Sequence, residues 1–362
     1  MIPTTLAKPN NLKDSWAKLR EENPSLRIRD AAEKLNVSEA ELLATQTGAT
    51  VTRLEPKFSE ILQELHTLGR IMALTRNNEI VHERKGEYRN VEVIQGHGKM
   101  GLVLGEDIDL RIFFAKWHFA FAVTSESPRG TMHSFQFFDL HGTAIHKVFL
   151  LNEIYLGTYQ DLAGKYRSAD QSQTLTIQPK LAKQPENPDA EIDIEGFRKG
   201  WAKLTDTHDF FPLMSKFGVS REQALRLADT EMVREVDAKS FRFILEEASK
   251  RKLPIMVFVG NDGIIQIHTG TVENIVEARG WFNVMDEKFN LHIDQDKIAR
   301  AFVVKKPTAD GTVTSLELFN AQGENVALFF GKRKPGIPEM QEWRELVAEL
   351  EKNWQNDPHS ER

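Results

Sequence analysis

Residues 70–86 read RIMALTRNNEIVHERKG, and residues 254–270 repeat the pattern as PIMVFVGNDGIIQIHTG. LRIFFAKWHFAFAV (110–123) and LHIDQDKIARAFVV (291–304) form a second matching pair. In these runs, β-branched and aromatic residues alternate with polar ones between Gly and Asn turns, which is typical of antiparallel strands. The second pair is spaced by 181 residues, half of the 362 in the chain. The sequence therefore predicts a duplicated chain.

Two further blocks extend the match. HSFQFFDLHG (133–142) and TSLELFNAQG (314–323) keep the same spacing, and we expect hairpin turns at Asp139–Gly142 and Asn320–Gly323. Upstream, SWAKLREENPSLRIRDAAEKLNVSEAELL matches GWAKLTDTHDFFPLMSKFGVSREQALRL with small gaps. Each half therefore begins helical, with Ser38 as an expected N-cap, and then turns into strands.

The predicted fold class is α+β, a tandem duplication of a helices-then-antiparallel-sheet unit. The polar, proline-bearing segment KLAKQPENPDAEID (180–193) is the predicted linker. We expect an N-terminal repeat over residues 1–185 and a C-terminal repeat over residues 186–362. A site between duplicated halves is a common place for a ligand.

The composition excludes several classes of protein. With 40% hydrophobic and 28% charged residues, the chain is typical of a soluble globular protein. It has no cysteine, which excludes disulfides, thiolate metal ligands and cysteine nucleophiles. RIFFAKWHFAFAV is too short and too charged to span a membrane, and the N-terminus lacks a secretory pattern. Because the net charge is −6, any anion must be met by a local cluster of cations.

An asymmetric ligand must break the repeat, so residues that differ between the halves are candidates for its site. Arg221 aligns with Glu39, and Arg111 aligns with His292. Basic residues gather in the second half, although the whole chain is acidic. Taken singly, each candidate also has a structural explanation as a packed or solvated surface residue. The candidates are His208, Arg221, Lys306 and Arg333 in the second half and Arg111 in the first.

His208 lies in TDTHDFFPLM, just ahead of Pro212. Proline is tolerated in the first turn of a helix, so we expect a helix to begin near Thr207 or Asp209. The positive end of that helix would favour a neutral imidazole, whose free nitrogen can bind a metal. Asp206 or Asp209 is expected either to orient this ring or simply to cap the helix.

Other chemistry has little support in the sequence. No HExxH, GxSxG, Walker A or GxGxxG motif is present. His133, His141 and His146 cluster around one hairpin, but the spacing of a zinc site is missing. IRDAAEKLNVSEAELLA (28–44) is similar to a helix-turn-helix, yet its second helix is acidic and would repel phosphates. A structural helical pair is the favoured interpretation.

Several blocks resemble a known family. MGLVLGEDIDLRIF, WFNVMDEKFNLHI, KKPTADGTVTSLELF and PIMVFVGN are similar to the bacterial hemin-degrading and haem-trafficking proteins of the HemS/ShuS/HmuS/PhuS type. The resemblance covers essentially the whole chain. It implies a cytoplasmic protein that receives haem b, as ligand or substrate, from an ABC transporter. It also implies a haem cleft between helical and sheet elements, with a haem oxygenase or a reductase as a further partner.

The resemblance also implies roles for individual residues. It places the axial iron ligand on His208 and a distal, catalytic arginine on Arg111. Phe113 lies two residues further along the same predicted strand, so it shares a face with Arg111 and can wall that side. Phe258 is a further wall candidate. The expected partners of the haem propionates are Arg221, Lys306 and Arg333, since cations suit a carboxylate edge.

The sequence also departs from the family pattern. Phe330 stands where relatives have tyrosine, which removes one hydrogen bond near the site. Asp209 and Phe211 replace the extra histidines of some haem-trafficking members, which puts a ligand-exchange transfer step in doubt. Pro212 also differs from the residue expected there.

Three functions remain open from the sequence. The first is degradation of haem to release iron, with an external reductant supplying electrons. The second is a carrier that delivers haem to a separate haem oxygenase, which would need the same residues. The third and most distant is a DNA-binding regulator. We expect no membrane insertion and no nucleic-acid partner.

Overall fold

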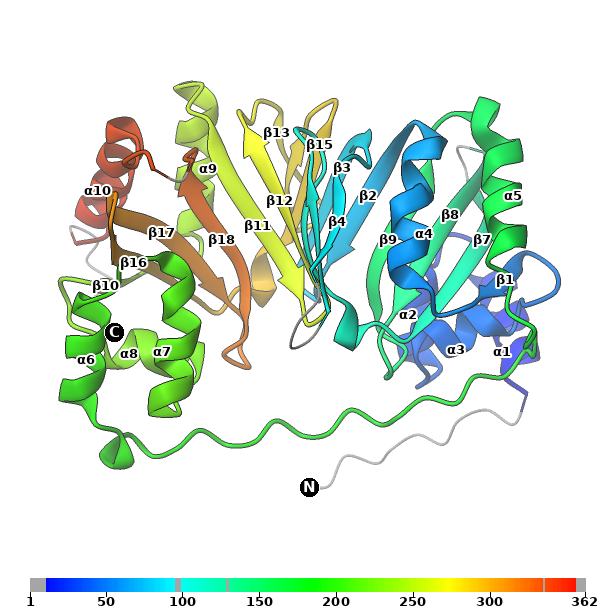
Figure 1. Cartoon of the computed structure of the whole chain (residues 1–362), viewed down its shortest axis with the longest axis horizontal. Helices are drawn as coiled ribbons and strands as arrows, with labels where there is room; N and C mark the ends of the chain where they lie inside the picture. Colours follow the sequence, from blue (N-terminus) through cyan, green and yellow to red (C-terminus); the bar gives the residue numbers. More distant parts are fainter. Residues whose placement is uncertain (1–10, 95–98, 128–129, 335, 356–362) are drawn as a thin grey trace. The chain divides into compact units, whose positions relative to one another are not determined.

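The computed structural model describes residues 11–94, 99–127, 130–334 and 336–355. Within these residues the chain runs twice through the same series of elements (Figure 1). Each series has three helices, a strand, a fourth helix, eight more strands and a closing helix. The predicted duplication and the α+β class are therefore confirmed.

The helices of the first half are α1 (Leu12–Glu22), α2 (Ile28–Lys34), α3 (Glu39–Ala44), α4 (Phe58–Glu64) and α5 (Leu156–Lys165). Its strands are β1 (Val51–Leu54), β2 (Arg70–Arg76), β3 (Ile80–Glu87), β4 (Val91–Ile94), β5 (Met100–Leu104), β6 (Asp109–Phe113), β7 (Phe119–Ser127), β8 (Gly130–Phe138) and β9 (Ala144–Leu150).

The helices of the second half are α6 (Ile194–Ala202), α7 (Phe210–Phe217), α8 (Arg221–Leu227), α9 (Ser240–Lys250) and α10 (Gln341–Gln355). Its strands are β10 (Val233–Val236), β11 (Ile255–Asn261), β12 (Ile264–Gly270), β13 (Ile275–Ala278), β14 (Trp281–Met285), β15 (Phe289–Asp294), β16 (Arg300–Thr308), β17 (Gly311–Phe319) and β18 (Asn325–Gly331).

The chain forms two compact units, and the boundary between them does not follow the repeat strictly. Unit 1 comprises Met1–Thr75, Arg84–Leu181 and Asn261–Ile265. Unit 2 comprises Arg76–Glu83, Ala182–Gly260 and Gln266–Arg362. The boundary falls inside β3 and β12, so the chain passes from one unit to the other within a strand. The division into domains of residues 1–185 and 186–362 stays a prediction.

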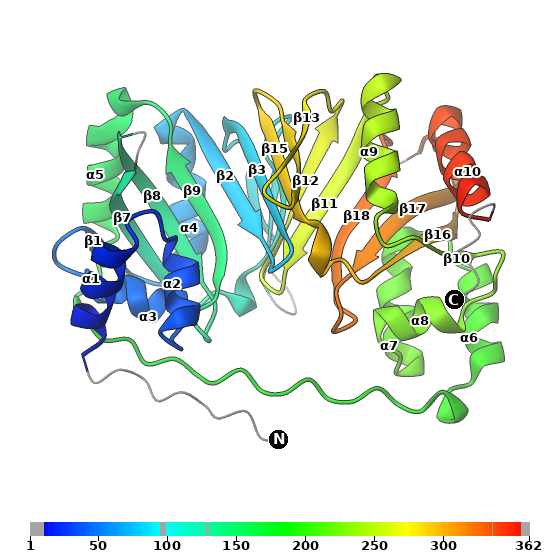
Figure 2. The same cartoon turned by 180° about the vertical axis from the view of Figure 1, so that it is seen from behind.

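In unit 1, five antiparallel strands follow the order β1-β7-β8-β9-β2, and β4, β5 and β6 form a second antiparallel run. Residues directly opposite each other on paired strands share a face of the sheet. One face carries Ala122, Phe135 and Val148 and packs against α4 and α5, which lie along these strands in Figures 1 and 2. The other face carries Phe121 and Val123 and packs against α3.

Unit 2 repeats this plan with the strand order β10-β16-β17-β18-β11 and a second run of β13, β14 and β15. Val303, Leu316 and Phe329 lie on the face covered by α9 and α10. Phe302 and Val304 lie on the opposite face, beneath α6, α7 and α8. Apolar residues on both faces explain why these strands read as nearly continuous hydrophobic runs.

Both predicted hairpin turns are present. The backbone N–H of Gly142 donates to the carbonyl of Asp139 at 3.1 Å, and Gly323 donates to Asn320 at the same distance. Gly142 has φ +77° and Gly323 has φ +70°, a region that glycine adopts without a steric penalty. The positions of both turns therefore follow from the local sequence, which supplies a glycine where the backbone needs a positive φ.

The helical pair α2 and α3 is structural, as the acidic second helix indicated. Ser38 is the N-cap of α3 and forms a reciprocal capping box with Glu41, which confirms the predicted cap. All six residues of α3 are buried. The helix therefore has no free face to place in a DNA groove.

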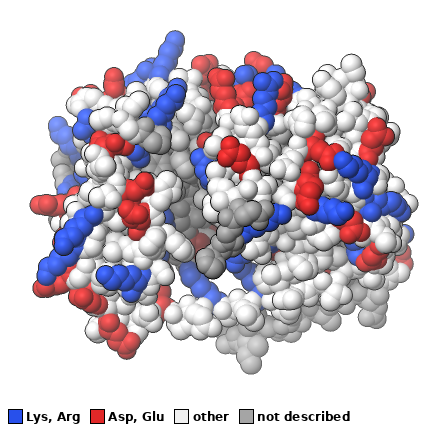
Figure 3. Space-filling model, in the orientation of Figure 1, with Lys and Arg blue, Asp and Glu red and all other residues white. Residues whose placement is uncertain are grey.

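Charged side chains of both signs are interspersed over the face drawn in Figure 3. A mixed surface of this kind creates no extended field of one sign, so a local cluster must recognise any charged ligand. Among the residues described, no helix is long and apolar enough to cross a membrane.

Candidate functional site

His208 lies in a short 3-10 helix (Thr207–Asp209) that runs directly into α7. Asp206 caps this turn, because its Oδ1 accepts a hydrogen bond from the backbone N–H of His208 at 2.8 Å. Pro212 is the third residue of α7, inside the first turn, where its missing N–H leaves no helical bond unmade. The prediction that His208 sits at the start of a helix is confirmed.

The ring of His208 is oriented by the same carboxylate. Its Nδ1 lies 2.7 Å from Oδ1 of Asp206, and its side chain is 92% exposed. Hydrogen bonds from the backbone and ring of His208 lower the pKa of Asp206, so its carboxylate is ionised. A carboxylate on Nδ1 directs the lone pair of a neutral imidazole to Nε2. Among the described residues Nε2 has no partner, so it is available to a metal.

Two of the predicted cations are held by one buried carboxylate, Glu317 of β17. Arg221 donates from Nε and Nη2 to its two oxygens at 2.8 and 2.9 Å. Lys306 of β16 donates from Nζ to Oε1 at 2.8 Å. Burial would raise the pKa of Glu317, but Arg221 and Lys306 outweigh it and lower this pKa to about 2. The three residues form a charged cluster that we call the Glu317 cluster.

The Glu317 cluster packs on Phe210, the first residue of α7. The Lys306 Nζ lies 4.6 Å and the Arg221 Cζ 5.5 Å from the centre of the Phe210 ring. Phe210 is 2% exposed and meets the Trp201 ring edge to face at 4.6 Å. These cation–π contacts anchor the start of the helix that follows His208.

Strand register places an apolar surface beside this cluster. Phe302 lies opposite Glu317, Glu317 opposite Leu328, and Leu328 opposite Phe258, so these four residues form one row across the same face. Phe302 and Glu317 are buried beneath helices, whereas Leu328 and Phe258 are only half-buried. Phe258 also meets Phe330 edge to face, with ring centres 5.2 Å apart. The row therefore runs from a buried charge to accessible apolar side chains.

Arg333 follows β18 and lies near the capping aspartate. Its Nη2 is 3.8 Å from Oδ2 of Asp310, and its charge contributes to the lowered pKa of Asp206. Its Nε is buried and has no hydrogen-bond partner among the described residues. The positive charge of Arg333 thus lies close to the His208 turn.

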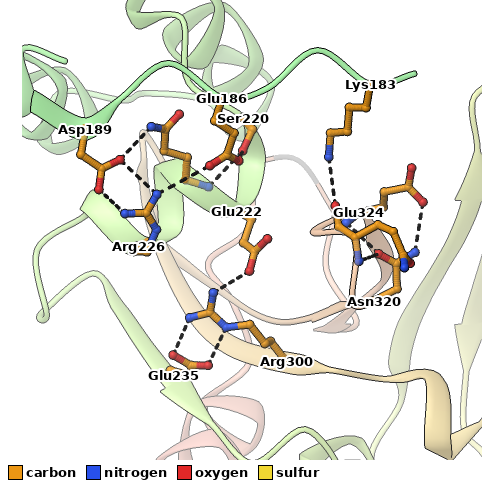
Figure 4. A network of polar contacts seen from close by, with 12 residues as sticks. Lys183, Glu186, Asp189, Ser220, Glu222, Arg226, Glu235, Arg300, Asn320 and Glu324 are labelled. Atoms are coloured by element: carbon orange, nitrogen blue, oxygen red, sulfur yellow. Dashed lines mark hydrogen bonds and ion pairs between the residues drawn. The ribbon is translucent and has the colours of Figure 1, made fainter. Parts of the chain in front are cut away.

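Helix α8, which begins with Arg221, is held by the segment that leads into the second repeat (Figure 4). Ser220 donates to Glu186, and Gln223 Nε2 donates to Oδ1 of Asp189 at 2.8 Å. Arg226 pairs with both Asp189 and Glu186. This part of the predicted linker therefore has a structural role, because it fixes the helix that carries Arg221.

Arg111 and Phe113 lie in unit 1, on β6. Arg111 donates from Nη1 to the carboxylate of Asp109 and to the Leu110 carbonyl at 3.2 Å. Burial raises the pKa of Asp109, and the positive charge of Arg111 acts in the opposite direction. Both Arg111 and Phe113 are half-buried, with Arg111 in the middle of this strand and Phe113 at its end.

The structure thus brings together, within unit 2, the turn of His208, the pair Arg221 and Lys306, and Arg333. The sequence-based prediction missed Glu317 and Phe210. A signal for Glu317 existed, because it is the one acidic residue in the strand TSLELF, at the position of Gln136 in the first repeat. Phe211, noted as a departure, is 75% exposed on α7.

Two other features do not coincide with the predicted site. A hollow of about 280 Å³ in unit 1 is lined by Pro56, Phe58, Ser59, Glu60, Lys99, Phe114 and Ala115. It contains none of the predicted residues. The three hairpin histidines bond separately, His133 to Thr124, His141 to Gln178 and His146 to Thr75 and Tyr88. Across the described ranges, no three acidic or histidine residues are grouped to hold a metal ion.

A duplicated α+β chain with an oriented histidine beside paired cations defines a class of ligand-binding proteins, and comparison identifies the family. The model of the haemin-degrading HemS/ChuX domain matches residues 36–166 and again residues 218–350. The first match begins just ahead of α3 and the second just ahead of α8. The chain belongs to this family, which confirms the resemblance seen in the sequence.

Individual relatives match over nearly the whole chain. The hemin transport protein HmuS of Yersinia pestis is 36% identical over 344 residues, which cover 94% of this chain and 97% of the relative. The crystal structure of holo-PhuS, a heme-binding protein from Pseudomonas aeruginosa, has 46% identity and a TM-score of 0.90, over 94% of this chain and 98% of that one. The heme degrading enzyme ChuS of Escherichia coli O157:H7 has 33% identity and a TM-score of 0.86, over 94% and 99%.

Proposed function

We propose that this protein binds haem b through His208 as axial ligand, in a bacterial pathway of haem uptake and iron acquisition. The observation that carries the proposal is the His208 ring, which is held at Nδ1 by Asp206 and keeps Nε2 available. The heme-binding relative PhuS and the hemin transport protein HmuS support the identity of the ligand.

The surroundings of His208 suit the rest of such a ligand. Haem is a flat apolar disc whose edge carries two carboxylates, so it needs apolar walls and a cationic rim. Phe258 supplies a wall within unit 2. Arg221, Lys306 and Arg333 supply the rim in the same unit. In the proposal, Arg111 and Phe113, on β6 of unit 1, have the roles of distal arginine and wall that the family resemblance implies.

In the proposed reaction, bound haem is degraded and its iron is released. Oxidative opening of the macrocycle would need dioxygen as the oxidant and an external reductant as the source of electrons, and the haem itself would supply the redox chemistry when bound. His208 orients the substrate, and Arg111 donates hydrogen bonds to developing negative charge. The relative ChuS of Escherichia coli, described as a heme degrading enzyme and as a heme oxygenase, supports this reaction. The proposed location is cytoplasmic, where a haem ABC transporter delivers the substrate.

A second candidate function is a carrier that passes haem to a separate haem oxygenase. It is favoured by the curated relatives of Yersinia, which are named hemin transport proteins. The same residues would bind the haem in both cases. A DNA-binding regulator has no comparable support, because α3 is buried.

The ligand assignment is tested by His208→Ala, with His118→Ala as a control at an exposed histidine outside the site. We expect His208→Ala to weaken hemin binding at least about tenfold and to shift the Soret band, because one axial bond is lost. The control should bind as the wild type does. An unchanged spectrum and affinity for His208→Ala would contradict the proposal.

The two functions are separated by adding a reductant to the haem complex in the presence of catalase. Loss of the Soret band with a tetrapyrrole cleavage product is expected of the enzyme. If catalase abolishes that loss, the bleaching is driven by free peroxide and the carrier function stands.

A further inference from the structure

Glu317 occupies the donors that the proposed ligand would use. Its side chain is 0% exposed, and it accepts two bonds from Arg221 and one from Lys306. Ser315 adds a fourth hydrogen bond, from Oγ to Oε1 at 3.2 Å. The Nε and Nη2 edge of Arg221, which suits a bidentate carboxylate, is therefore filled by a carboxylate of the protein itself.

The equivalent positions of the first repeat carry a different set of side chains. Glu39 begins α3 as Arg221 begins α8, and it pairs with Lys147 of β9. Gln136, at the position of Glu317, is neutral and donates to Ser134 at 3.0 Å. The buried set of the first repeat therefore has a net charge of zero.

The second repeat has one positive charge in excess, because two cations share the single carboxylate of Glu317. Leu328 lies directly opposite Glu317, and Lys147 lies directly opposite Gln136, the equivalent of Glu317 in the first repeat. The second repeat therefore has Leu328 where the first has Lys147. A half-buried apolar side chain thus replaces the sheet cation of the first repeat. Excess positive charge beside an apolar surface suits a ligand that is both apolar and anionic.

We infer that Glu317 is an internal counter-ion that competes with the carboxylates of the ligand for Arg221 and Lys306, and so limits how tightly the site holds an anionic porphyrin. This inference rests on the proposed function. The carboxylates of the ligand would then accept hydrogen bonds only from those N–H groups of Arg221 and Lys306 that do not donate to Glu317. A site that keeps its cations neutralised in this way releases its ligand more easily than a site with two free cations.

Competition requires that Glu317 stays charged while the ligand binds. The two cations keep its pKa far below neutral pH, although burial acts in the opposite direction. The charged groups that face Lys306 are Glu317 from β17 and Arg221 from α8, while α7 contributes only the ring of Phe210. No acid other than Glu317 is bonded to Arg221 or Lys306 among the residues described.

The test is Glu317→Gln, which removes the charge and keeps the shape. We expect hemin to bind about tenfold more tightly, the equivalent of about 1.4 kcal/mol, because the charges of Arg221 and of the buried Lys306 are then no longer neutralised and attract its carboxylates. Hemin dimethyl ester lacks those carboxylates, so its affinity should not rise. Equal or weaker hemin binding by a folded Glu317→Gln variant, or equal tightening for the ester, would overturn the inference.

The matched control is Glu39→Gln, which removes the carboxylate of the equivalent pair in the first repeat. Both variants should unfold at lower temperature than the wild type, since each removes the carboxylate of a buried ion pair. Only Glu317→Gln should change the affinity for hemin. Similar tightening in Glu39→Gln would mean a general loosening of the fold and would overturn the inference.

If Glu317→Gln does not fold, the same comparison is made in a variant that lacks the positive charge of Lys306. Lys306→Met leaves Arg221 and Glu317 with no net charge, and Lys306→Met/Glu317→Gln restores one positive charge. The double variant should bind hemin more tightly than Lys306→Met alone, and equal or weaker binding would overturn the inference. Failure of the wild type to bind hemin would instead contradict the proposed function itself.

Discussion

At the scale of single residues, Asp206 decides what His208 can do. One carboxylate oxygen caps the 3-10 turn and also holds the imidazole Nδ1. Without it, an exposed histidine would rotate freely, and ordering it would cost conformational entropy on binding. The sequence left the choice between orienting the ring and capping the helix open, and the structure assigns both roles to Asp206.

We therefore expect Asp206→Ala to lower hemin affinity by about tenfold or more, because carboxylate partners of metal-bound histidines contribute on that scale. Asp206→Asn keeps an acceptor oxygen and should lose less. The Fe–His stretching frequency in resonance Raman spectra should fall in both, because the imidazole loses its charged partner. Asp209→Asn is the control, since Asp209 accepts only a 3.4 Å bond from Thr205. An unchanged frequency in Asp206→Ala would contradict the role.

His146 shows how burial changes a histidine. It is 1% exposed, its Nδ1 lies 2.9 Å from the Thr75 hydroxyl, and its Nε2 is bonded to Tyr88. Desolvation lowers the pKa of His146 to about 3, so the ring is neutral in the folded protein. The histidine cluster seen in the sequence thus separates into one core residue and two hairpin residues.

The lowered pKa of His146 makes stability depend on pH. Below about pH 6.5 an unfolded chain binds a proton at this histidine that the folded chain does not bind until about pH 3. The free energy of unfolding should therefore fall as the pH falls through this window, by up to about 1.4 kcal/mol per pH unit from this group. His146→Gln should make the slope shallower by that amount in urea titrations between pH 7 and pH 4. An equal slope, with His118→Gln as control, would contradict the assignment.

At the scale of elements, the hairpin between β17 and β18 packs its turn against the start of α8. A Cβ on Gly323 would lie 2.1 Å from Oε2 of Glu222, and Glu222 is itself bonded to Arg300 at 2.5 Å. In the first repeat, a Cβ on Gly142 would lie 2.2 Å from the hydroxyl of the capping Ser38. Both hairpins therefore need glycine for backbone conformation; at Gly142 the approach of Ser38 adds to this need, whereas at Gly323 the flexible side chain of Glu222 can move aside.

Gly323→Ala should lower the free energy of unfolding by roughly 1–3 kcal/mol, because the left-handed conformation disfavours alanine. The displaced Glu222 should add to that loss. Gly280→Ala is the matched control, since its φ of +81° is close to that of Gly323 and nothing lies within 4 Å of an added Cβ. Denaturant titration of both variants measures the difference. Equal losses would show that contact with Glu222 contributes nothing.

At the scale of the whole molecule, ligand binding and stability are linked. A ligand that binds only the folded protein stabilises it by about 2.7 kcal/mol at a free concentration one hundred times its Kd. We expect hemin at saturation to raise the unfolding free energy of the wild type by about this amount. With hemin bound tenfold more weakly, the same hemin concentration should stabilise His208→Ala by only about 1.4 kcal/mol, as measured by denaturant titration. Equal stabilisation of both proteins would mean that hemin binds elsewhere.

Much of the fold could be predicted from the sequence. The duplication, the α+β class, the two hairpin turns and the position of His208 at a helix start are confirmed, whereas strands β1 and β10 ahead of the fourth helix of each half and the closing helices α5 and α10 were not predicted. These features depend on local periodicity and on the chemistry of turns and caps, which short segments carry by themselves. The family followed from the same blocks. The roles of the predicted site residues stay proposals.

Contacts between residues that are far apart along the chain could not be predicted from the sequence. Arg221 and Glu317 are 96 residues apart, and only the register of β16, β17 and β18 under α8 brings them together. By itself, the sequence determined that the second repeat departs from the first in charge. The tertiary structure decided that this charge is neutralised in part by a buried carboxylate, because the energy of an ion pair depends on distance and burial rather than on position along the chain.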